Sequence, residues 1–431
     1  MLRNKKANLI AWKDKEKRLP LILLGARQVG KTYLLKEFAS EFYKDFIYIN
    51  FELEPQMRSL FEKDLKPERI ISEIELIYMK KIDMNHTLIF FDEIQLEMKA
   101  VTALKYFAEA SMQYHIVGAG SLLGVALNRE NYSFPVGKVE MHYLYPLTFD
   151  EFLRGIGFEI ILPRIEEAFH KSEALPSAMH DQLIEKYTQY LYIGGMPSAI
   201  NEFIRCGLNV IDFDRSVHEN IINAYIADMS KYTTKAEVMK VQAIYRSIPD
   251  QLAGDQRKFK YNLVEKGAKA LTFGSSIEWL LLSQVSIECA LINRGEIPLS
   301  VYKDPKGFKL YFSDVGLLMA ITRIPYMTMV REHEHNLFKG AVTENYVAQQ
   351  LKARGYDLYY WKHNCNEVDF ILQKDEQIIP IEVKASTNKR SRSLMAYIGQ
   401  YQPRQSIRIS KKNFGCVEGI KSVPLYAVYL I

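Results

Sequence analysis

The chain has 431 residues, too many for a single hydrophobic core, so its length predicts two to four domains. Its 56 Lys and Arg residues only slightly outnumber the 51 Asp and Glu residues, and the net charge of +5 permits nucleic-acid binding without arguing for it. The four cysteines show no C-x-x-C spacing, which argues against a zinc site and against a disulfide framework.

The N-terminal residues are rich in lysine and lack the apolar segment of a secretory signal. The most apolar long stretch, residues 279–292, is interrupted by Gln284 and Glu288 and is too short to span a bilayer. We therefore expect a cytoplasmic protein without a membrane segment.

Residues 25–32 read G-A-R-Q-V-G-K-T and directly follow the apolar run 21–24. This spacing is typical of a phosphate-binding loop that leaves a strand and opens a helix, here residues 33–40. Lys31 would reach the outer phosphates of a nucleotide, and the Thr32 hydroxyl would bind magnesium. A chance match in a glycine-containing turn is the alternative. The residues expected to bind the nucleotide are Gly25, Ala26, Arg27, Gln28, Val29, Gly30, Lys31, Thr32 and Tyr33.

Further apolar segments at 46–51, 87–91, 114–117 and 139–144 alternate with helical patterns that include 67–81 and 99–110. This alternation predicts a parallel sheet with helices on both faces. The second of these segments runs into Asp92 and Glu93, as in a Walker B motif. Asp92 would hold magnesium, and Glu93 would orient the attacking water. Because another strand lies between the two motifs along the chain, we expect their strands to be separated in the sheet by one strand.

The segment 114–117 is followed by G-A-G-S, which ends at Ser121. A polar residue at this place would lie between the two motifs, near the γ-phosphate. Ser121 is therefore a candidate sensor of the nucleotide. It is equally a candidate N-cap of the helix that follows, and both roles can coexist.

Further motifs follow in order: Y-P-L-T-F-D-E-F-L at 145–153, G-G-M-P at 194–197 and K-L-Y-F-S-D-V-G-L-L at 309–318. Together with residues 25–32 and 92–95, they resemble the predicted AAA+ ATPases of bacteria and archaea that carry an uncharacterised C-terminal domain. The resemblance covers essentially the whole chain and implies ATP as the nucleotide.

The sequence departs from this family at Lys138, where Gly-Arg is usual. An arginine there would be the finger for a neighbouring subunit's ATP, because its planar fork matches phosphate oxygens. Lysine keeps the charge and loses the fork, and Arg129 or Arg154 are the candidates to replace it. A homo-oligomer stays open on these grounds.

The middle of the chain is expected to form a helical lid at 151–232 and a winged helix at 233–330. The winged helix would consist of helices at 236–252 and 275–285, the second capped by Ser275 or Ser276, and strands at 290–293 and 309–312. Basic residues at 257–260 and 303–309 would contact a DNA backbone or line a surface for protein contacts. Both readings stay open, because the candidate recognition segment, 276–279, is not basic.

The last part, residues 331–431, resembles the PD-(D/E)xK nuclease core. Asp369 lies on one expected strand and Glu382-x-Lys384 on the next, where residues two apart share a face. Glu344, on an expected helix at 342–354, would complete the acidic cluster. The carboxylates would bind magnesium or manganese, and Lys384 would position or deprotonate the water. The basic run 389–392 would hold DNA.

The predicted fold is α/β: an AAA+ ATPase core at 1–150, a helical lid, a winged helix and a restriction-endonuclease-like domain. We expect ATP, Mg²⁺ and DNA as ligands. The expected catalytic residues are Lys31, Glu93, Glu344, Asp369, Glu382 and Lys384, and the expected metal ligands are Thr32, Asp92, Asp369 and Glu382. The competing hypothesis is a nucleotide-switched regulator or scaffold that binds DNA or protein without cutting.

Overall fold

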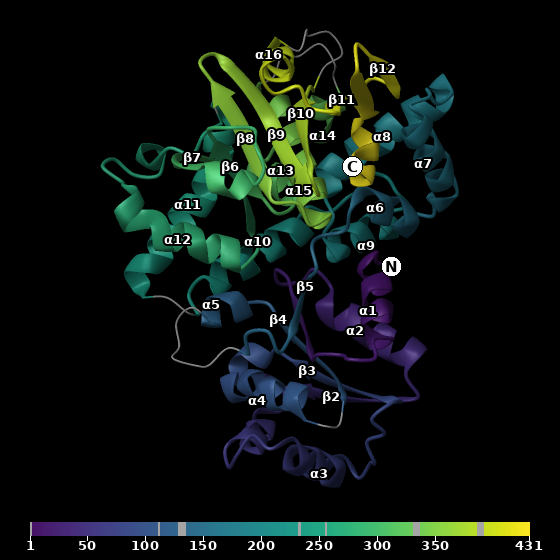
Figure 1. The fold of residues 1–431 in the computed structure, drawn as a ribbon, viewed down its shortest axis with the longest axis vertical. Helices are drawn as coiled ribbons and strands as arrows, with labels where there is room; N and C mark the ends of the chain where they lie inside the picture. Colours follow the sequence, from purple (N-terminus) through teal and green to yellow (C-terminus); the bar gives the residue numbers. More distant parts are fainter. Residues whose placement is uncertain are drawn as a thin grey trace. The chain divides into compact units, whose positions relative to one another are not determined.

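The computed structural model describes residues 2–110, 113–127, 135–231, 234–254, 257–330, 337–385 and 392–431. The chain divides into two compact units, Leu2–Tyr145 and Pro146–Ile431 (Figure 1). The domain boundary predicted at residue 150 stays a prediction. The finer division of the second unit into lid, winged helix and nuclease-like domain stays a prediction.

The N-terminal unit alternates strands and helices along the chain, as predicted. Its strands are β1 (Leu21–Leu24), β2 (Asp45–Asn50), β3 (Thr87–Asp92), β4 (His115–Gly120) and β5 (Glu140–Tyr143). Its helices are α1 (Lys5–Lys13), α2 (Lys31–Phe42), α3 (Pro67–Tyr78), α4 (Met98–Glu109) and α5 (Leu123–Leu127), with 3₁₀ turns η1 (Pro55–Phe61) and η2 (Ile94–Leu96). The apolar runs of β1, β3 and β4 are buried throughout, which explains why they lack polar alternation.

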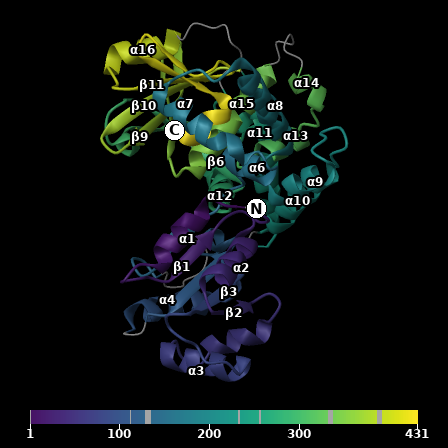
Figure 2. The ribbon, with the colours of Figure 1, turned by 90° about the vertical axis from the view of Figure 1, so that its right-hand side faces the viewer.

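The five strands form one parallel sheet in the order β2-β3-β4-β1-β5. The motif strands β1 and β3 are separated by β4, as predicted. Right-handed crossovers place α2 on one face and α3 and α4 on the other. The packing agrees, because α1 contacts α2 while α3 contacts α4 (Figure 2).

The C-terminal unit begins with a helical part. It contains α6 (Phe149–Gly155), α7 (Leu162–Lys171), α8 (Ser177–Ile193), α9 (Pro197–Arg205), α10 (Ser216–Asp228), α11 (Lys235–Ala253) and α12 (Ala270–Leu282). Later helices are α13 (Val315–Ile321), α14 (Tyr326–Val330), α15 (Leu337–Ala353) and α16 (Arg392–Tyr401), with 3₁₀ turns η3 (Glu159–Ile161), η4 (Tyr261–Leu263), η5 (Leu299–Tyr302) and η6 (Leu425–Leu430). The long helix α8 packs on α13 and η6, so the predicted lid helices share the core of this unit.

An eight-stranded mixed sheet runs through this unit in the order β12-β13-β11-β10-β9-β8-β6-β7. The strands are β6 (Ser286–Ile292), β7 (Lys303–Phe312), β8 (Leu358–His363), β9 (Asn366–Lys374), β10 (Gln377–Val383), β11 (Ser406–Ser410), β12 (Gly415–Val417) and β13 (Ile420–Pro424). The predicted wing strands β6 and β7 form an antiparallel pair, but β6 also pairs in parallel with β8. The hairpin is therefore continuous with the sheet of the predicted nuclease-like domain.

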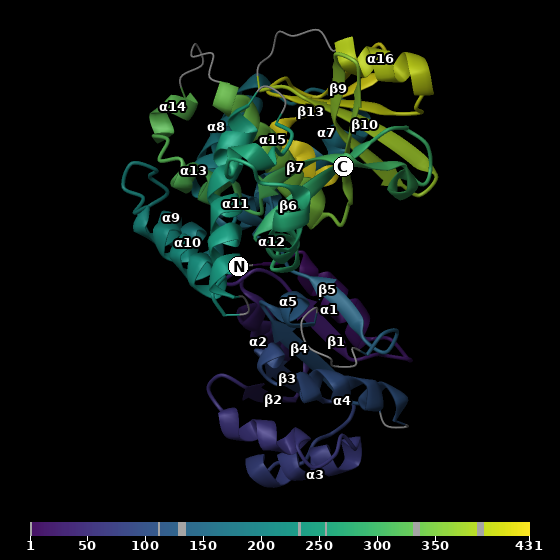
Figure 3. The ribbon, with the colours of Figure 1, turned by 90° about the vertical axis from the view of Figure 1, so that its left-hand side faces the viewer.

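Two helices cover opposite faces of this sheet (Figure 3). On one face, Leu394 and Tyr397 of α16 pack against Trp361, Val368 and Ile371. On the other face, α15 lies against β6 and β7. The segments 357–361, 367–372 and 378–384 predict three strands for this region, and β8, β9 and β10 occur within two residues of these ends.

The predicted cap of the second winged-helix helix is wrong. The helix α12 begins at Ala270, so Ser275 and Ser276 lie in its interior and cap nothing. The candidate recognition segment is also mostly core, because Ser276, Ile277 and Trp279 are buried. An apolar helix face that packs on neighbours cannot read a DNA groove.

The G-G-M-P and S-D-V-G motifs meet in one buried junction. The carboxylate of Asp314 accepts hydrogen bonds from the backbone N–H of Gly195 (2.6 Å) and Leu317 (3.1 Å). Gly194 has a φ of +77°, and a Cβ there would overlap Asp314 Oδ1. Burial raises the pKa of Asp314 to about 6. These motif residues therefore join α8, α9 and α13, which is a role in folding.

Candidate functional site

The predicted phosphate loop connects β1 to α2. Gly30 takes a φ of +95° at the start of α2, a conformation that favours glycine. Gly25 lies so close to β5 that a Cβ would be 2.5 Å from the Leu144 carbonyl oxygen. Lys31 is buried, and its Nζ donates to the carbonyl oxygens of Gly25 (2.8 Å) and Ala26 (3.0 Å). The lysine expected to reach a phosphate is thus enclosed by the phosphate loop and bonded to two of its carbonyl oxygens.

The other loop residues predicted to line the nucleotide differ in exposure. Ala26 and Val29 are buried, Arg27 is half-buried, and Tyr33 is 60% exposed. Gln28 has a φ of +66°. Their contact with a nucleotide stays a prediction.

Thr32 and Asp92 meet at the carboxyl edge of the sheet. The Thr32 hydroxyl donates to Asp92 Oδ2 at 2.8 Å, although the two residues are 60 positions apart. Asp92 is 3% exposed and ends β3. A hydroxyl and a carboxylate are hard oxygen ligands, which suits Mg²⁺ beside bound phosphates. These two residues therefore fit the magnesium ion that a nucleotide of this class brings.

Two residues of β2 support Asp92 and were not predicted. The Tyr48 hydroxyl donates to Asp92 Oδ2 at 2.9 Å, and Asn50 Nδ2 donates to that hydroxyl at 3.0 Å. Burial, with the nearby Asp92 charge, raises the pKa of Tyr48 to about 12, so the hydroxyl remains a donor at neutral pH. The sheet order could have predicted these two residues, because Asn50 pairs directly with Asp92 only when β2 lies beside β3.

Glu93 follows Asp92 with a φ of +51°. Its Oε2 accepts a hydrogen bond of 2.6 Å from Gln95 Nε2. Ser121 follows β4, the strand between the two motif strands, and is half-buried. The fold thus brings Ser121 to the edge that carries the phosphate loop and the acidic pair, as expected, whereas its contact with a nucleotide stays a prediction.

Two of the residues considered for the arginine finger form ion pairs with acidic side chains. Lys138 pairs with Glu109 at 3.1 Å, and Arg154 pairs with Asp150 at 2.9 Å. Arg129 lies outside the described residues. The finger, and the assembly it would imply, remain predictions.

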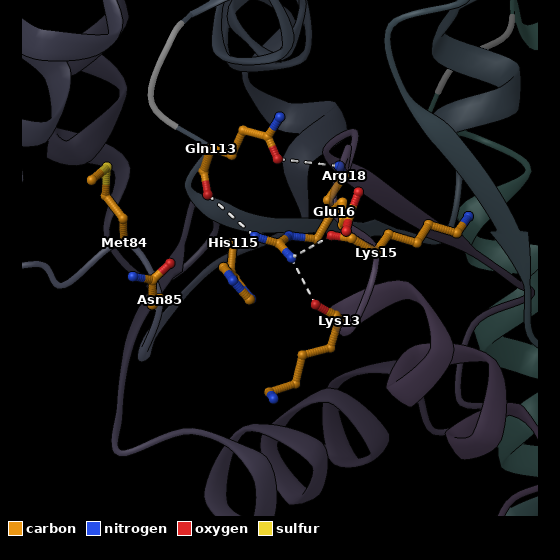
Figure 4. Close-up of a pocket in the computed structure, with 8 residues that line it drawn as sticks. All are labelled: Lys13, Lys15, Glu16, Arg18, Met84, Asn85, Gln113 and His115. Atoms are coloured by element: carbon orange, nitrogen blue, oxygen red, sulfur yellow. Dashed lines mark hydrogen bonds between the residues drawn. The ribbon is translucent and has the colours of Figure 1, made fainter.

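A hollow of about 470 Å³ lies at the opposite edge of the same sheet, where β3 and β4 begin (Figure 4). The Arg18 guanidinium donates to the carbonyl oxygens of Lys13 (2.7 Å) and Gln113 (3.2 Å). Lys15 pairs with Glu140 at 2.8 Å. These cationic side chains bond to other groups of the N-terminal unit. Because the phosphate loop lies at the other edge of the sheet, the hollow is not the nucleotide site. Its lining residues are Lys13, Lys15, Glu16, Arg18, Met84, Asn85, Gln113 and His115.

In the C-terminal unit, Glu344 is fully buried in a cage of donors. Lys309 Nζ lies 2.9 Å from Glu344 Oε1, and Arg257 and the Tyr311 hydroxyl also bond to its carboxylate. Lys309 is itself fully buried and pairs with Glu367 at 2.8 Å. A carboxylate neutralised by an internal ammonium and a guanidinium is a structural ion pair. Both cations, predicted to contact DNA, are instead paired with Glu344, and Lys309 is fully buried while Arg257 is half-buried.

Asp369 and the E-x-K residues lie on neighbouring strands, as predicted. Asp369 Oδ2 accepts the backbone N–H of Val383 at 2.7 Å, and Val383 is the middle residue of E-x-K. Glu382 is 2% exposed, and its Oε1 lies 2.8 Å from Lys384 Nζ. Its Oε2 is buried without a hydrogen-bond partner among the described residues.

The predicted three-carboxylate cluster does not form. Within the described ranges, no three His, Cys, Asp or Glu side chains gather in a way that could hold a metal ion. Glu344 binds its own cations in place of joining Asp369 and Glu382. Of the basic run predicted to hold DNA, Lys389, Arg390 and Ser391 lie outside the described residues.

Comparison with protein families decides the class of the first unit. Residues 17–153 match the family described as AAA domain. The N-terminal region is therefore an ATPase domain of the AAA, P-loop type. Residues 184–328 and 339–428 match two families described as domains of unknown function, DUF8612 and DUF4143. No curated protein matches the sequence. Within the described part of the chain, no helix has the length and apolar character needed to cross a bilayer.

Several solved structures resemble the chain weakly. The Walker-type ATPase PABY2304 of Pyrococcus abyssi is 15% identical, with 75% of this chain and 95% of that protein covered and a TM-score of 0.43. The Aeropyrum pernix ORC2 protein is 11% identical, with 77% and 96% covered and a TM-score of 0.40. The Thermotoga maritima RuvB branch migration motor is 16% identical, with 65% and 86% covered and a TM-score of 0.28. At such scores, the three likenesses leave the function of this chain open.

Proposed function

We propose that this protein is a magnesium-dependent ATPase that acts on DNA. The observation that carries the ATPase part of the proposal is the 2.8 Å hydrogen bond between Thr32 and Asp92 beside the phosphate loop. It joins the two motifs at the one edge where Lys31 and Glu93 also lie. Bound magnesium would supply positive charge to the phosphate oxygens at this pair.

The remaining work falls to the chain's own groups. Glu93 orients a water molecule, whose oxygen bonds to the γ-phosphorus while the bond to the bridging oxygen of ADP breaks. The products are ADP, phosphate and a proton. Lys31 leaves its carbonyl partners and donates to the outer phosphates. Loop N–H groups and the start of α2 stabilise the phosphate charge.

For the C-terminal sheet we propose a metal-dependent nuclease centre made of Asp369, Glu382 and Lys384. Its support is the buried Oε2 of Glu382, which has no hydrogen-bond partner among the residues that the structure describes. A buried charged oxygen without a donor calls for a cation or water. Water would add to the phosphorus of a DNA diester, one P–O bond would break, and the leaving oxygen would take a proton. Lys384, ion-paired with Glu382, would hold the water and would not remove its proton.

DNA would lie along the β7 side of the unit. The segment before η4 runs beside β7, because Phe259 N donates to Phe308 O at 2.8 Å. Lys260, Lys303 and Lys306 on these segments are exposed and could pair with phosphates.

The second candidate is a nucleotide-switched regulator that binds DNA or protein without cutting. It is favoured by the burial of Glu344 and Lys309 and by the pairing of Arg257 with Glu344, which takes one acid out of the proposed nuclease centre and ties up two cations predicted to contact DNA. Binding without cleavage would need only the exposed lysines.

The test is cleavage of linear and circular DNA by the full chain with magnesium or manganese, with and without ATP, beside Lys384→Ala. We expect cleavage that is lost in the variant, and a dependence on ATP if the sites are coupled. Equal cleavage by both proteins would remove the nuclease centre. Salt-dependent DNA binding with no cleavage would support the regulator, and absence of binding would leave a protein partner.

A further inference from the structure

The turn after β3 folds back over the end of β4 and packs into two glycines there. A Cβ on Gly118 would lie 2.9 Å from Ile94 Cδ1, and a Cβ on Gly120 would overlap Gln95 Oε1. The glycines of G-A-G are therefore spaced two apart to receive the side chains of Ile94 and Gln95. Neither glycine has a φ that requires glycine, so close packing is the reason for both.

The Gln95 amide has one possible orientation. Its neighbour at 2.6 Å is the Glu93 carboxylate, which only accepts hydrogen bonds, so the amide NH₂ must face Glu93. The amide oxygen then faces Gly120. Gln95 is 8% exposed, and this oxygen has no hydrogen-bond partner among the described residues. The amide is thus held between the acidic pair and the strand that leads to Ser121.

We propose that Gln95 is a positioning residue for ATP hydrolysis. It fixes Glu93 Oε2 and leaves Oε1 to face the attacking water. Through Gly120 it links the orientation of Glu93 to β4, the strand that ends beside Ser121. The inference rests on the proposed role of Glu93 as the group that orients water.

The chemistry of an amide suits this role better than that of a cation. A lysine or arginine at this place would form an ion pair and neutralise Glu93, as Lys309 does to Glu344. A neutral donor fixes the geometry and keeps the negative charge for the water. The length of the glutamine side chain also matters, because the same side chain must reach both Glu93 and the end of β4.

The experiment compares ATP turnover by wild type, Gln95→Leu, Gln95→Ala, Gly120→Ala and the double variant Gln95→Ala/Gly120→Ala. Gln95→Leu keeps the bulk and loses the donor, and we expect kcat to fall about 100-fold with KM unchanged, as for a misplaced catalytic group. Gly120→Ala should act alike, because its methyl group displaces the amide. In the double variant the two losses should not add, since they affect one contact.

Controls separate positioning from folding. Gly274→Ala, at a glycine with no atom within 4 Å of the added Cβ, should keep wild-type turnover. Binding of a non-hydrolysable ATP analogue should be unchanged in each variant. Should Gln95→Leu fail to fold, Gln95→Met keeps the length of the side chain, removes the donor and should lose kcat equally.

The inference would be overturned by a wild-type kcat in Gln95→Leu, or by a rise in KM as large as the fall in kcat. Losses that add in the double variant would also overturn it. Glu93→Gln serves as the reference for the proposed function. If Glu93→Gln loses turnover and Gln95→Leu does not, only the inference about Gln95 fails. If Glu93→Gln also turns over normally, the proposed role of Glu93 fails with it.

Discussion

The key carboxylates of the two units have different kinds of hydrogen-bond partner. In the N-terminal unit, Asp92 and Glu93 accept hydrogen bonds from neutral donors: Thr32, Tyr48 and Gln95. In the C-terminal unit, Glu344 is surrounded by Lys309, Arg257 and Tyr311. Neutral donors hold a carboxylate in place and leave its charge for a metal ion or water. Internal cations use that charge for stability. For Asp92, Glu93 and Glu344, the type of partner therefore separates a proposed chemical role from a structural one better than the carboxylate itself.

The largest expected effect tests the structural side of this comparison. Lys309→Met leaves the buried Glu344 without its ammonium and removes one cation from the half-buried Glu367, and we expect the C-terminal unit to lose about 3–5 kcal/mol of unfolding free energy. Urea unfolding followed by tryptophan fluorescence measures it. Lys303→Met, on an exposed position of the same strand, is the matched control. Equal stability of the two variants would show that the cage is not structural.

The next effect tests the phosphate loop. Lys31→Ala removes the ammonium that now bonds to Gly25 and Ala26, and we expect nucleotide affinity to fall about 10- to 100-fold, the range for lost charged hydrogen bonds. Calorimetric titration with ATP measures it, with the exposed Lys44→Ala as control. Unchanged affinity in Lys31→Ala would remove the lysine from the nucleotide site.

A smaller effect tests the neutral donors. Tyr48→Phe removes the hydroxyl that orients Asp92, and we expect the magnesium concentration for half-maximal ATP turnover to rise about 10-fold. A magnesium titration at saturating ATP measures it. An unaltered titration would mean that Asp92 is held by Thr32 alone.

A further test concerns the dependence of stability on pH in both units. Burial lowers the pKa of His115 to about 3 and that of His218 to about 4. Because the unfolded chain takes up protons first as the pH falls below about 6.5, the unfolding free energy should decrease by at most about 1.4 kcal/mol per pH unit for each histidine. The decrease should continue to about pH 4 for His218 and further for His115.

Unit-specific fluorescence can follow this pH effect. Trp12 lies 6.1 Å from His115 in the N-terminal unit, while Trp279 and Trp361 report on the C-terminal unit. Urea unfolding between pH 7.5 and 5 gives the change of unfolding free energy with pH. This change should differ between wild type and His115→Gln only when unfolding is followed at Trp12. A pH-independent wild type would contradict the buried, neutral state of both histidines.

The sequence was most informative where a motif is local. Residues 25–32 and 92–95 are short segments whose spacing sets their own geometry, and the strand order followed from the extra strand between them. Tyr48 and Asn50 were missed because their contact with Asp92 depends on which strand lies beside β3. Gln95 was part of a recognised motif, yet its contact with Gly120 appears only in the folded sheet.

In the C-terminal unit the strands were predictable and the acidic cluster was not. Alternation and turns located β9 and β10 with Asp369 and Glu382. Glu344 was assigned to the cluster because helix and strands occur in the right order, but its partners on β7 come from a segment predicted as a wing. Packing decides which of several charged side chains pairs with a buried carboxylate, and the spacing of residues along the chain does not predict that choice.

The most direct measurement is ATP binding and turnover by Glu93→Gln beside wild type. We expect the variant to bind ATP with wild-type affinity and to lose turnover by about 10²- to 10⁴-fold, because the amide cannot polarise the water. Normal turnover by Glu93→Gln would contradict the assignment of the N-terminal acidic pair as the catalytic site.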